Sequence, residues 1–300
     1  MWRVIDLGGT GYYLHTVHNK LIVEKDGEES LIPFDDIHSI ICHGIGFRYS
    51  DKFFKSCLHH KVPVTFCDEK HIPLGMLLPM LQHKDTSQRM DIQLKASLPR
   101  RKQAWQQIIT EKLKNQRDFL QHLQIPGVKR LDVLSQTVLS GDSSNNEAQG
   151  ARVYFESIYG TSFFRSDEDN AINGKLDYGY SILRSAVARA VVDTGLLPSC
   201  GVFHSSRINP FCLVDDLMEP FRPMVDSLVL AMCSKYGVIE DLESREKKEL
   251  MRITAREVVF EEQDVEFSYA LRLYVLSYLS FLSRNRDAIQ FPKYRYAWAV

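Results

Sequence analysis

The pattern of apolar residues changes about a quarter of the way along this 300-residue chain. Before residue 80, short runs of β-branched and aromatic residues alternate with turns rich in glycine and asparagine, which is typical of strands. The expected strands are residues 2–7, 12–17, 21–24, 37–42 and 62–66. From about Thr86 onward, apolar residues recur at the 3.6-residue period of helices instead. We therefore predict an α+β fold, with a small N-terminal β-rich domain followed by a larger all-α C-terminal domain.

The domain boundary is expected where this pattern changes. Residues 1–80 would form the β-rich domain, residues 81–87 the linker and residues 88–300 the helical domain, and a chain of this length fits one large domain or two. One helix is expected inside the β-rich domain, because Ser50 and Asp51 precede apolar residues at helical spacing. The later helices are expected near residues 88–123, 128–139, 144–159, 175–195, 215–236, 246–260 and 266–283.

Charge is nearly balanced over the whole chain, with 37 basic and 38 acidic residues and a net charge of −1. Bulk positive charge therefore gives no argument for nucleic-acid binding. Residues 84–130, however, carry eleven Lys and Arg against four acidic residues, and the C-terminal tail sets basic residues among Phe291, Tyr294, Tyr296 and Trp298. Such a mixture suits a phosphate backbone with stacked bases. A solvated helix face and a packed tail explain the same pattern equally well.

Two features indicate the compartment. No apolar run approaches the roughly 18 residues that span a bilayer, and the first residues lack the pattern of a secretion signal. The six cysteines are scattered without a CxxC pair, which argues against a zinc ribbon, a redox motif and a disulfide framework. We expect a cytoplasmic protein that has no membrane contact and whose cysteines are reduced.

A glycine-rich turn follows the first expected strand. The segment IDLGGTG, residues 5–11, resembles the first phosphate motif of the sugar-kinase and actin superfamily. That fold also needs a second phosphate loop and a glycine-rich adenosine loop, and the sequence offers neither. We expect instead a tight hairpin turn between Leu7 and Tyr12, in which the glycines adopt positive φ angles.

Two segments of the helical part carry single candidate groups. Glu147 lies in or near the first turn of a helix, after Ser143 and Ser144, and a capping box is the commoner role for a residue in this position. His204 stands alone between apolar residues and a polar loop, a pattern that is more often structural than ligating.

A third segment crowds carboxylates onto one helix face. Asp216 and Asp215 precede Glu219 by three and four residues, so the three side chains would stack on a helix and repel one another. A helix start near Pro220, whose dipole favours carboxylates, and the cation Arg222 offer one relief. A divalent ion that joins Glu219 to a carboxylate and an imidazole from elsewhere is the functional alternative, and such ligands suit Mn²⁺ or Mg²⁺.

Taken in order, these segments resemble a known family. The pattern consists of ExxxARxYF from Glu147, YGYSIL from Tyr178, then His204, then DLMEPFRPxxD from Asp216. This combination is similar to the CRISPR-associated integrase of spacer acquisition, the adaptation nuclease conventionally called "Cas one", over essentially the whole chain. The forms DLMEPFRP and YGYSILRS and the compact length are similar to members from type II systems. One departure is Asp177, where relatives commonly have Asn.

The resemblance implies a catalytic metal site built from Glu147, His204 and Glu219, with Asp216 as a supporting carboxylate. It implies Mg²⁺ or Mn²⁺ as the cofactor and DNA as the substrate. It also implies a homodimer that pairs through the β-rich domain and flanks a small ferredoxin-like CRISPR companion protein.

Further residues are candidates for contact with DNA. In the basic stretch these are Arg100, Arg101 and Lys102. Tyr154 lies one helix face along from Glu147, and it would either orient the substrate or be a core aromatic residue.

The implied activity is the insertion of foreign DNA fragments into a CRISPR array, in which the 3′-hydroxyl of a fragment attacks a repeat phosphodiester. Because one phosphodiester is exchanged for another, no ATP is required. Two alternatives stay open: a metal-dependent repair nuclease acting on branched or free DNA with water as the nucleophile, and a non-catalytic DNA-binding scaffold whose acidic residues only cap helices. Convergence of Glu147, His204 and Glu219 on one cavity, within reach of an ion about 2.0 to 2.6 Å from each ligand atom, would favour the chemical interpretations. Separation of the three would favour helix caps.

Overall fold

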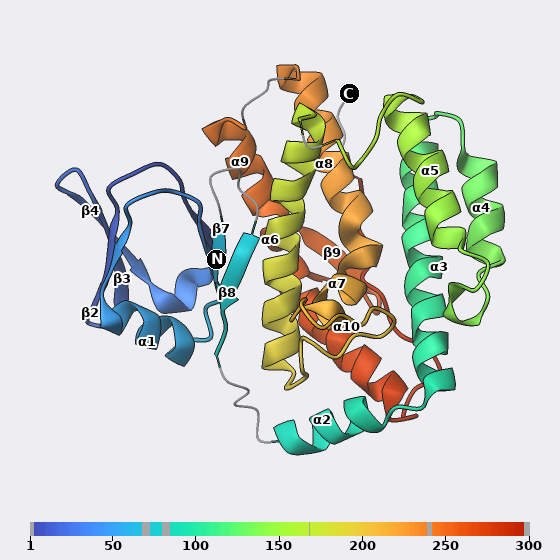
Figure 1. Ribbon diagram of the computed structural model, residues 1–300, viewed down its shortest axis with the longest axis horizontal. Helices are drawn as coiled ribbons and strands as arrows, with labels where there is room; N and C mark the ends of the chain where they lie inside the picture. The colour runs from blue at the N-terminus through green and yellow to red at the C-terminus, as the bar shows by residue number, and fades with distance from the viewer. Residues whose placement is uncertain (1–2, 68–72, 80–84, 168, 239–241, 297–300) are drawn as a thin grey trace.

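The computed structural model describes residues 3–67, 73–79, 85–167, 169–238 and 242–296. It confirms an N-terminal part made largely of strands and a mostly helical remainder (Figure 1). The N-terminal elements are β1 (Arg3–Leu7), β2 (Tyr13–Val17), β3 (Lys20–Lys25), β4 (Glu28–Pro33), β5 (Ile37–Cys42), β6 (Arg48–Tyr49), α1 (Asp51–His59), β7 (Val64–Cys67) and β8 (Pro73–Leu77).

The strands form two sheets of four, in the orders β1-β5-β7-β8 and β4-β3-β2-β6. In the first sheet β1, β5 and β7 are parallel and β8 is antiparallel to β7. A separate hydrophobic core lies between these elements, and helix α1 contributes Phe53 and Cys57 to it. The expected cap of α1 is confirmed, because the Ser50 hydroxyl accepts a hydrogen bond from the Phe53 amide at 3.1 Å.

The glycine-rich turn after β1 is not a hairpin turn, so that expectation was wrong. Strand β1 pairs with β5 in one sheet, whereas β2 pairs with β3 and β6 in the other. Gly9 and Gly11, with φ angles of 97° and 82°, carry the chain from one sheet to the other. The Asp6 carboxylate accepts a hydrogen bond from the Tyr178 hydroxyl at 2.6 Å and lies 2.9 Å from His43 Nε2. This motif therefore ties the β-rich part to the helical part.

The helical part follows the expected order with shifted ends. Its helices are α2 (Thr86–Lys95), α3 (Leu98–His122), α4 (Val128–Gln136), α5 (Asn146–Tyr159), α6 (Ala171–Asp193), α7 (Cys212–Met218), α8 (Arg222–Tyr236), α9 (Ser244–Met251) and α10 (Phe267–Leu282). The expected helix at 88–123 is two helices. Helix α2 ends at Lys95, and α3 begins after Ser97 with Pro99 in its first turn. Helix α2 begins at Thr86, so the last two residues of the expected linker are helical.

The all-α description of this part needs one correction. Strands β9 (Glu257–Phe260) and β10 (Gln263–Glu266) form an antiparallel hairpin where the pattern suggested the end of a helix. Two valines and a phenylalanine favour a strand at β9, and Glu261 and Glu262 form the turn with positive φ angles. An acidic pair in the left-handed region gives no sequence signal comparable to Asn-Gly.

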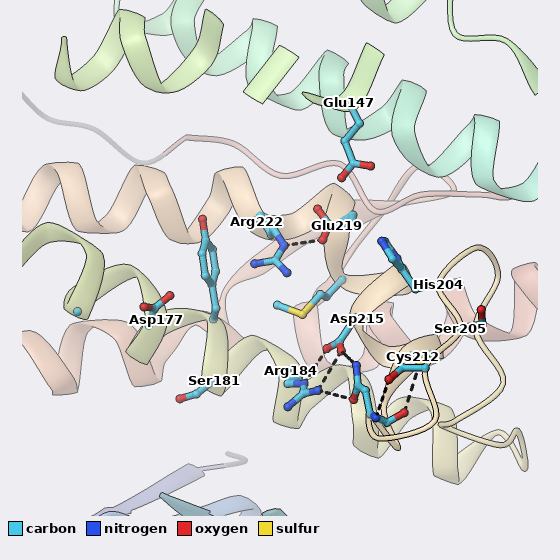
Figure 2. Close-up of a pocket in the computed structure, with 15 residues that line it drawn as sticks. Glu147, Asp177, Ser181, Arg184, His204, Ser205, Cys212, Asp215, Glu219 and Arg222 are labelled. Atoms are coloured by element: carbon cyan, nitrogen blue, oxygen red, sulfur yellow. Dashed lines mark hydrogen bonds and ion pairs between the residues drawn. The ribbon is translucent and has the colours of Figure 1, made fainter. Parts of the chain in front are cut away.

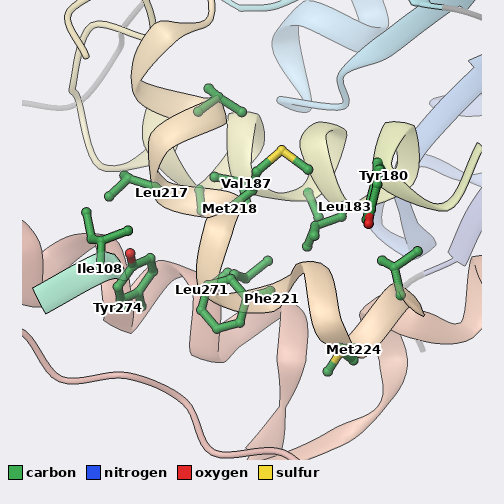
Figure 3. Close-up of a cluster of buried hydrophobic side chains, with 14 of the residues drawn as sticks. Ile108, Tyr180, Leu183, Val187, Leu217, Met218, Phe221, Met224, Leu271 and Tyr274 are labelled. Carbon is green, nitrogen blue, oxygen red and sulfur yellow. The ribbon is translucent and has the colours of Figure 1, made fainter. Parts of the chain in front are cut away.

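Helix α6 forms the centre of the larger core. Most of its residues are buried around its whole circumference, which is expected only of an interior helix. Figure 3 shows Leu183 and Val187 of α6 among Met218, Phe221 and Leu271, which come from the α7–α8 region and from α10. This packing holds the segment with the crowded carboxylates against α6 and α3.

The aromatic residues of the C-terminal tail belong to this core. Phe291, Tyr294 and Tyr296 pack against it, and the hydroxyls of Tyr294 and Tyr296 donate to backbone carbonyls. The packed-tail alternative therefore describes these three rings, while Trp298 lies outside the described residues. All six cysteines are free thiols, and within the described ranges no helix is both long and apolar enough to cross a bilayer.

Candidate metal centre

Asp142, which the sequence analysis did not single out, caps the start of helix α5 in place of Glu147. Asp142 accepts hydrogen bonds from the backbone amides of Asn146 at 2.8 Å and Glu147 at 3.0 Å, at the start of α5. Neither Ser143 nor Ser144 makes a side-chain cap, and Asn145 precedes the helix in the left-handed conformation. The capping-box explanation of Glu147 was therefore wrong, and its carboxylate is available for other contacts.

The Glu147 carboxylate instead shares a cation with Glu219. The Lys112 ammonium lies 2.7 Å from Glu147 Oε1 and 2.5 Å from Glu219 Oε2. The two carboxylate oxygens are thus separated by no more than the sum of these distances, although the residues are 72 positions apart in the sequence. Lys112 and Glu219 are buried, whereas the Glu147 side chain is 24% exposed.

Local structure turns Glu219 away from its acidic neighbours. Helix α7 ends at Met218, and a 3₁₀ turn over Glu219–Phe221 leads into α8. Glu219 Oε1 accepts a hydrogen bond from Arg222 Nε at 2.7 Å. Burial alone would raise the pKa of Glu219, but the charges of Arg222 and Lys112 outweigh it and lower this pKa to about 2. Glu219 is thus a buried, ionised carboxylate.

The three crowded carboxylates do not share one face, which corrects the expectation of a stack. Asp215 forms an ion pair with Arg184, with contacts of 2.7 and 2.9 Å. Asp216 points instead to His204, and Glu219 points to Lys112 and Arg222. Each acid is therefore balanced by a separate partner.

The His204 ring is held by Asp216. His204 Nδ1 lies 2.5 Å from Asp216 Oδ1, and Asp216 Oδ2 accepts the backbone amides of Phe203 at 2.8 Å and His204 at 3.3 Å. The hydrogen bond to Asp216 raises the pKa of His204 above its usual value, and burial raises the pKa of Asp216. In the neutral ring, this contact places the proton on Nδ1 and leaves the Nε2 lone pair free to bind a ligand.

Glu147, His204 and Glu219 line one open cavity of about 810 Å³. Figure 2 shows Glu147 reaching toward Glu219 from the opposite wall, with His204 beside them. Arg184 and Arg222 line the same cavity, so cationic groups and acidic groups face a common space. The three side chains therefore face a common cavity.

The three side chains are not drawn tightly around one point. Within the described ranges, a His/Glu set whose ligand atoms all lie within 4.8 Å of one another is found on the β-rich part, at His15, Glu24 and Glu29. Glu147, His204 and Glu219 do not reach this spacing. The two glutamates are held together by Lys112, and His204 is held by Asp216 at the side of the cavity.

The candidate DNA contacts fall in different surroundings. Arg100 donates to the backbone carbonyls of Phe281 and Arg286, and Arg101 donates to those of Gly201 and Val202, just before His204. Both guanidinium groups therefore support loops of the fold, whereas Lys102 is exposed. Tyr154 is fully buried, which is the core-aromatic alternative for this residue.

Sequence reasoning missed Lys112 as part of the site. It lies on the buried face of α3 with Ile108, Ile109 and Leu113, where an ordinary helix would have an apolar residue. A lysine at a core position was the available signal. Asp177 also lines the cavity, and its carboxylate pairs with Arg165 at 2.5 Å.

Comparison with known proteins decides the family. The family model described as CRISPR associated protein Cas1 matches residues 7–264. This chain belongs to the Cas1 family. A CRISPR-associated endonuclease Cas1 from Neisseria meningitidis serogroup C is 32% identical over 294 residues, which cover 97% of this chain and 96% of that protein.

Solved structures share the Cas1 fold. A casposase bound to an integration product aligns with a TM-score of 0.84 and 20% identity, covering 99% of this chain and 96% of that chain. A Cas6-RT-Cas1–Cas2 complex aligns with a TM-score of 0.76 and 19% identity, covering 95% of this chain and 35% of that chain. The β-rich and helical parts are therefore arranged as in other Cas1 proteins.

The donor set of this Cas1 site fits a divalent metal ion. Two carboxylates and one imidazole face the cavity, and hard oxygen ligands with one nitrogen suit Mg²⁺ or Mn²⁺. The Lys112 ammonium between Glu147 and Glu219 shows that these oxygens already accommodate a cation. His204 carries the carboxylate partner that ligating histidines usually have.

Proposed function

We propose that this Cas1 protein is a divalent-metal-dependent DNA integrase and endonuclease that inserts DNA fragments into a CRISPR array. The observation that carries the proposal is that Glu147, His204 and Glu219 line one cavity. Glu147 does not cap its helix, and His204 is held in place by Asp216. The relative from Neisseria meningitidis is named an endonuclease, and the casposase with the same fold is bound to an integration product. Both support this class of reaction.

In this proposal Glu147, His204 and Glu219 hold Mg²⁺ or Mn²⁺. Such an ion, when bound, stabilises negative charge on a phosphate and on the oxygens that enter and leave it. Asp216 keeps the ligating nitrogen of His204 turned toward the cavity by accepting the proton on the other ring nitrogen. Burial of Asp216 makes this orientation rigid.

Basic groups on the cavity wall would position the DNA phosphate. Arg222 bonds Glu219 at 2.7 Å and its guanidinium lies over the Tyr180 ring, so its position is fixed from two sides. Arg184 is fixed in the same way by Asp215 and Asn209. Guanidinium groups held like this match the geometry of phosphate oxygens.

The proposed reaction conserves phosphodiester bonds. A bond forms between the 3′-oxygen of the incoming fragment and the repeat phosphorus, while the bond from that phosphorus to the repeat oxygen breaks. The proton of the attacking hydroxyl is released and the departing oxygen gains one. No nucleotide hydrolysis is needed, because one phosphodiester replaces another.

The assembly proposed for this chain follows its relatives. DNA is the substrate, both as foreign fragments and as the repeat array. The neighbour from a Cas6-RT-Cas1–Cas2 complex favours a small Cas partner, for which we propose the ferredoxin-like form, together with a homodimer of this chain. A relation to type II systems and a cytoplasmic location remain predictions.

Substitution of the three cavity residues tests the proposal. We expect Glu147→Gln, His204→Ala and Glu219→Gln each to reduce metal-dependent strand joining by about a hundredfold or more, because each removes a ligand. Binding of duplex DNA, measured by fluorescence anisotropy, should change little. Glu156→Gln, on the same helix as Glu147 and paired with Arg152 at 2.8 Å, is the matched control and should keep full activity.

The nature of the nucleophile separates integration from hydrolysis. A labelled fragment with a 3′-hydroxyl should become joined to a repeat substrate, and the same fragment with a 3′-deoxy end should not. Equal product from both fragments would identify water as the nucleophile and support the repair-nuclease alternative. Unchanged activity in the Glu147 and His204 variants would support the non-catalytic scaffold.

A further inference from the structure

We propose that Lys112 is the built-in counter-ion of the metal-free site, and that a divalent ion and the Lys112 ammonium occupy the position between Glu147 and Glu219 in turn. This inference rests on the proposed metal dependence and assigns a residue outside the ligand set. Lys112 would keep the two carboxylates together without metal and would set the affinity with which metal binds.

The first support is the geometry of Lys112. Its ammonium contacts Glu147 Oε1 at 2.7 Å and Glu219 Oε2 at 2.5 Å, so one nitrogen joins two carboxylates from different elements. The side chain comes from the buried face of α3, and only 9% of it is exposed. Two carboxylates this close would repel strongly in a partly desolvated site if no cation lay between them.

The second support is the charge balance of the cavity. Arg222 already compensates one carboxylate through its contact with Glu219 Oε1. If a divalent ion joined Lys112 and Arg222 at the same two carboxylates, four positive charges would face two negative charges around the buried Glu219, which is costly. The ion and the ammonium must therefore compete for the same oxygen atoms.

The third support is a place to which the ammonium can move. A second cavity of about 190 Å³ is lined by Lys112, Glu219 and Asp226, together with Tyr180 and Arg222. Asp226 is buried and accepts a hydrogen bond from the Tyr180 hydroxyl. Its carboxylate offers negative charge to a lysine that swings away from the glutamates, and the four-carbon stem of lysine allows such a movement.

The matched pair of Lys112→Met and Lys114→Met tests this exchange. Methionine keeps the length and the apolar stem of residue 112 but removes its charge, while Lys114 is exposed two positions along the same helix. In EDTA, Lys112→Met should lower the melting temperature by about 5 °C or more, because the buried Glu219 and the partly exposed Glu147 lose their shared cation. Lys114→Met should leave it unchanged.

Metal binding provides the second readout, independent of activity. By calorimetric titration, Lys112→Met should bind Mn²⁺ about tenfold more tightly than the wild type, because the competing ammonium is gone. Mn²⁺ should also raise the melting temperature of Lys112→Met by more than that of the wild type. Should Lys112→Met be unfolded in EDTA, recovery of its circular-dichroism spectrum on addition of Mn²⁺ would support the exchange.

A double variant checks that the loss in EDTA comes from the carboxylates. Adding Glu147→Gln to Lys112→Met removes one of the two negative charges, so this double variant should regain most of the melting temperature lost without metal. If it does not, the effect of Lys112→Met arises from packing and the proposal is wrong.

The outcomes separate this inference from the proposed function. If the wild type binds Mn²⁺ but Lys112→Met binds it equally or more weakly, Lys112 does not compete and the exchange is refuted while metal dependence stands. If the wild type binds neither Mn²⁺ nor Mg²⁺ at millimolar concentration, the proposed metal dependence fails and the exchange fails with it. An unchanged melting temperature of Lys112→Met in EDTA also refutes the role of Lys112.

Discussion

Two buried lysines of this Cas1 protein face carboxylates in different ways. Lys175 on α6 lies 2.8 Å from Glu246 on α9, and both side chains are at most 1% exposed. The second oxygen of Glu246 accepts the Glu243 amide at the start of α9. The Lys112 ammonium, in contrast, contacts two carboxylates, those of Glu147 and Glu219, and both of these line an open cavity.

The difference separates a structural ion pair from an exchangeable one. At Lys175 one positive charge meets one negative charge, the remaining carboxylate oxygen is bonded, and both side chains are shielded from solvent. At Lys112 the carboxylates outnumber the lysine and one of them, Glu147, is partly exposed. Burial of a lysine alone therefore does not indicate function. The difference lies in one ammonium shared between two carboxylates that line an open cavity.

The largest effect on stability is expected at the sealed pair. Lys175→Met leaves Glu246 buried without a counter-charge, which should cost about 3 to 5 kcal/mol of unfolding free energy. Urea denaturation should give the same loss in EDTA and in Mn²⁺, because no ion can reach Glu246. Adding Glu246→Gln to Lys175→Met should recover part of the loss, since the amide oxygen can still cap α9.

This prediction can break the comparison. If Mn²⁺ restores the stability of Lys175→Met as it should restore that of Lys112→Met, then access to the cavity does not distinguish the two lysines. The contrast would then rest on charge number alone.

The sequence predicted the coarse fold correctly, and it named candidate ligands whose role stays a prediction, but it did not reveal the residues around them. The start of α1 was predicted correctly from Ser50, because a cap depends on neighbouring residues, whereas the helix boundary at Ser97 and Pro99 was missed. The glycine turn after β1 was misjudged, because strand patterns do not specify which sheet a strand joins. Convergence of Glu147, His204 and Glu219 could be expected only through the family resemblance.

The partners of the site residues, Asp142 at the start of α5 and Lys112 beside the two glutamates, could not be paired with them from the sequence. Asp142 and not a nearby serine caps α5, because a turn with positive φ at Gly141 and Asp142 aims that carboxylate at the helix start. Lys112 reaches Glu147 and Glu219 only after α3, α5 and the turn after α7 have packed together. Contacts between residues this far apart in the sequence leave no local signal.

A pH-dependent effect of intermediate size is expected at Asp226, a buried carboxylate without an ion pair in the described part of the chain. Burial raises its pKa to about 6, despite the hydrogen bond from Tyr180 and the nearby charges of Arg222 and Arg165. The folded protein therefore holds a proton that the unfolded chain releases near pH 4. Its stabilising contribution is complete below about pH 4 and is lost as pH rises through about 6.

Comparison with Asp226→Asn measures this contribution. The unfolding free energy of the wild type, relative to Asp226→Asn, should fall by up to about 3 kcal/mol between pH 4 and pH 7. Chemical denaturation in EDTA at several pH values gives the difference. A difference independent of pH would show that burial does not raise the pKa of Asp226, and would place Asp226 with the compensated carboxylates.

The smallest expected effect concerns Asp216, whose buried charge is balanced by an imidazole and two amides in place of a lysine. Asp216→Asn should keep the side-chain shape but lose the charge that holds His204 Nδ1, so His204 would turn more freely at the cavity wall. We expect Mn²⁺ affinity to fall by about tenfold to a hundredfold, as for other partners of ligating histidines.

Calorimetry on Asp216→Asn and Asp215→Asn separates the two neighbours, because Asp215 pairs with Arg184 and does not touch His204. Equal losses of affinity in the two variants would mean that the cavity responds to total negative charge. A loss confined to Asp216→Asn would show that a carboxylate can orient a ligand, just as Lys112 is proposed to stand in for the metal ion.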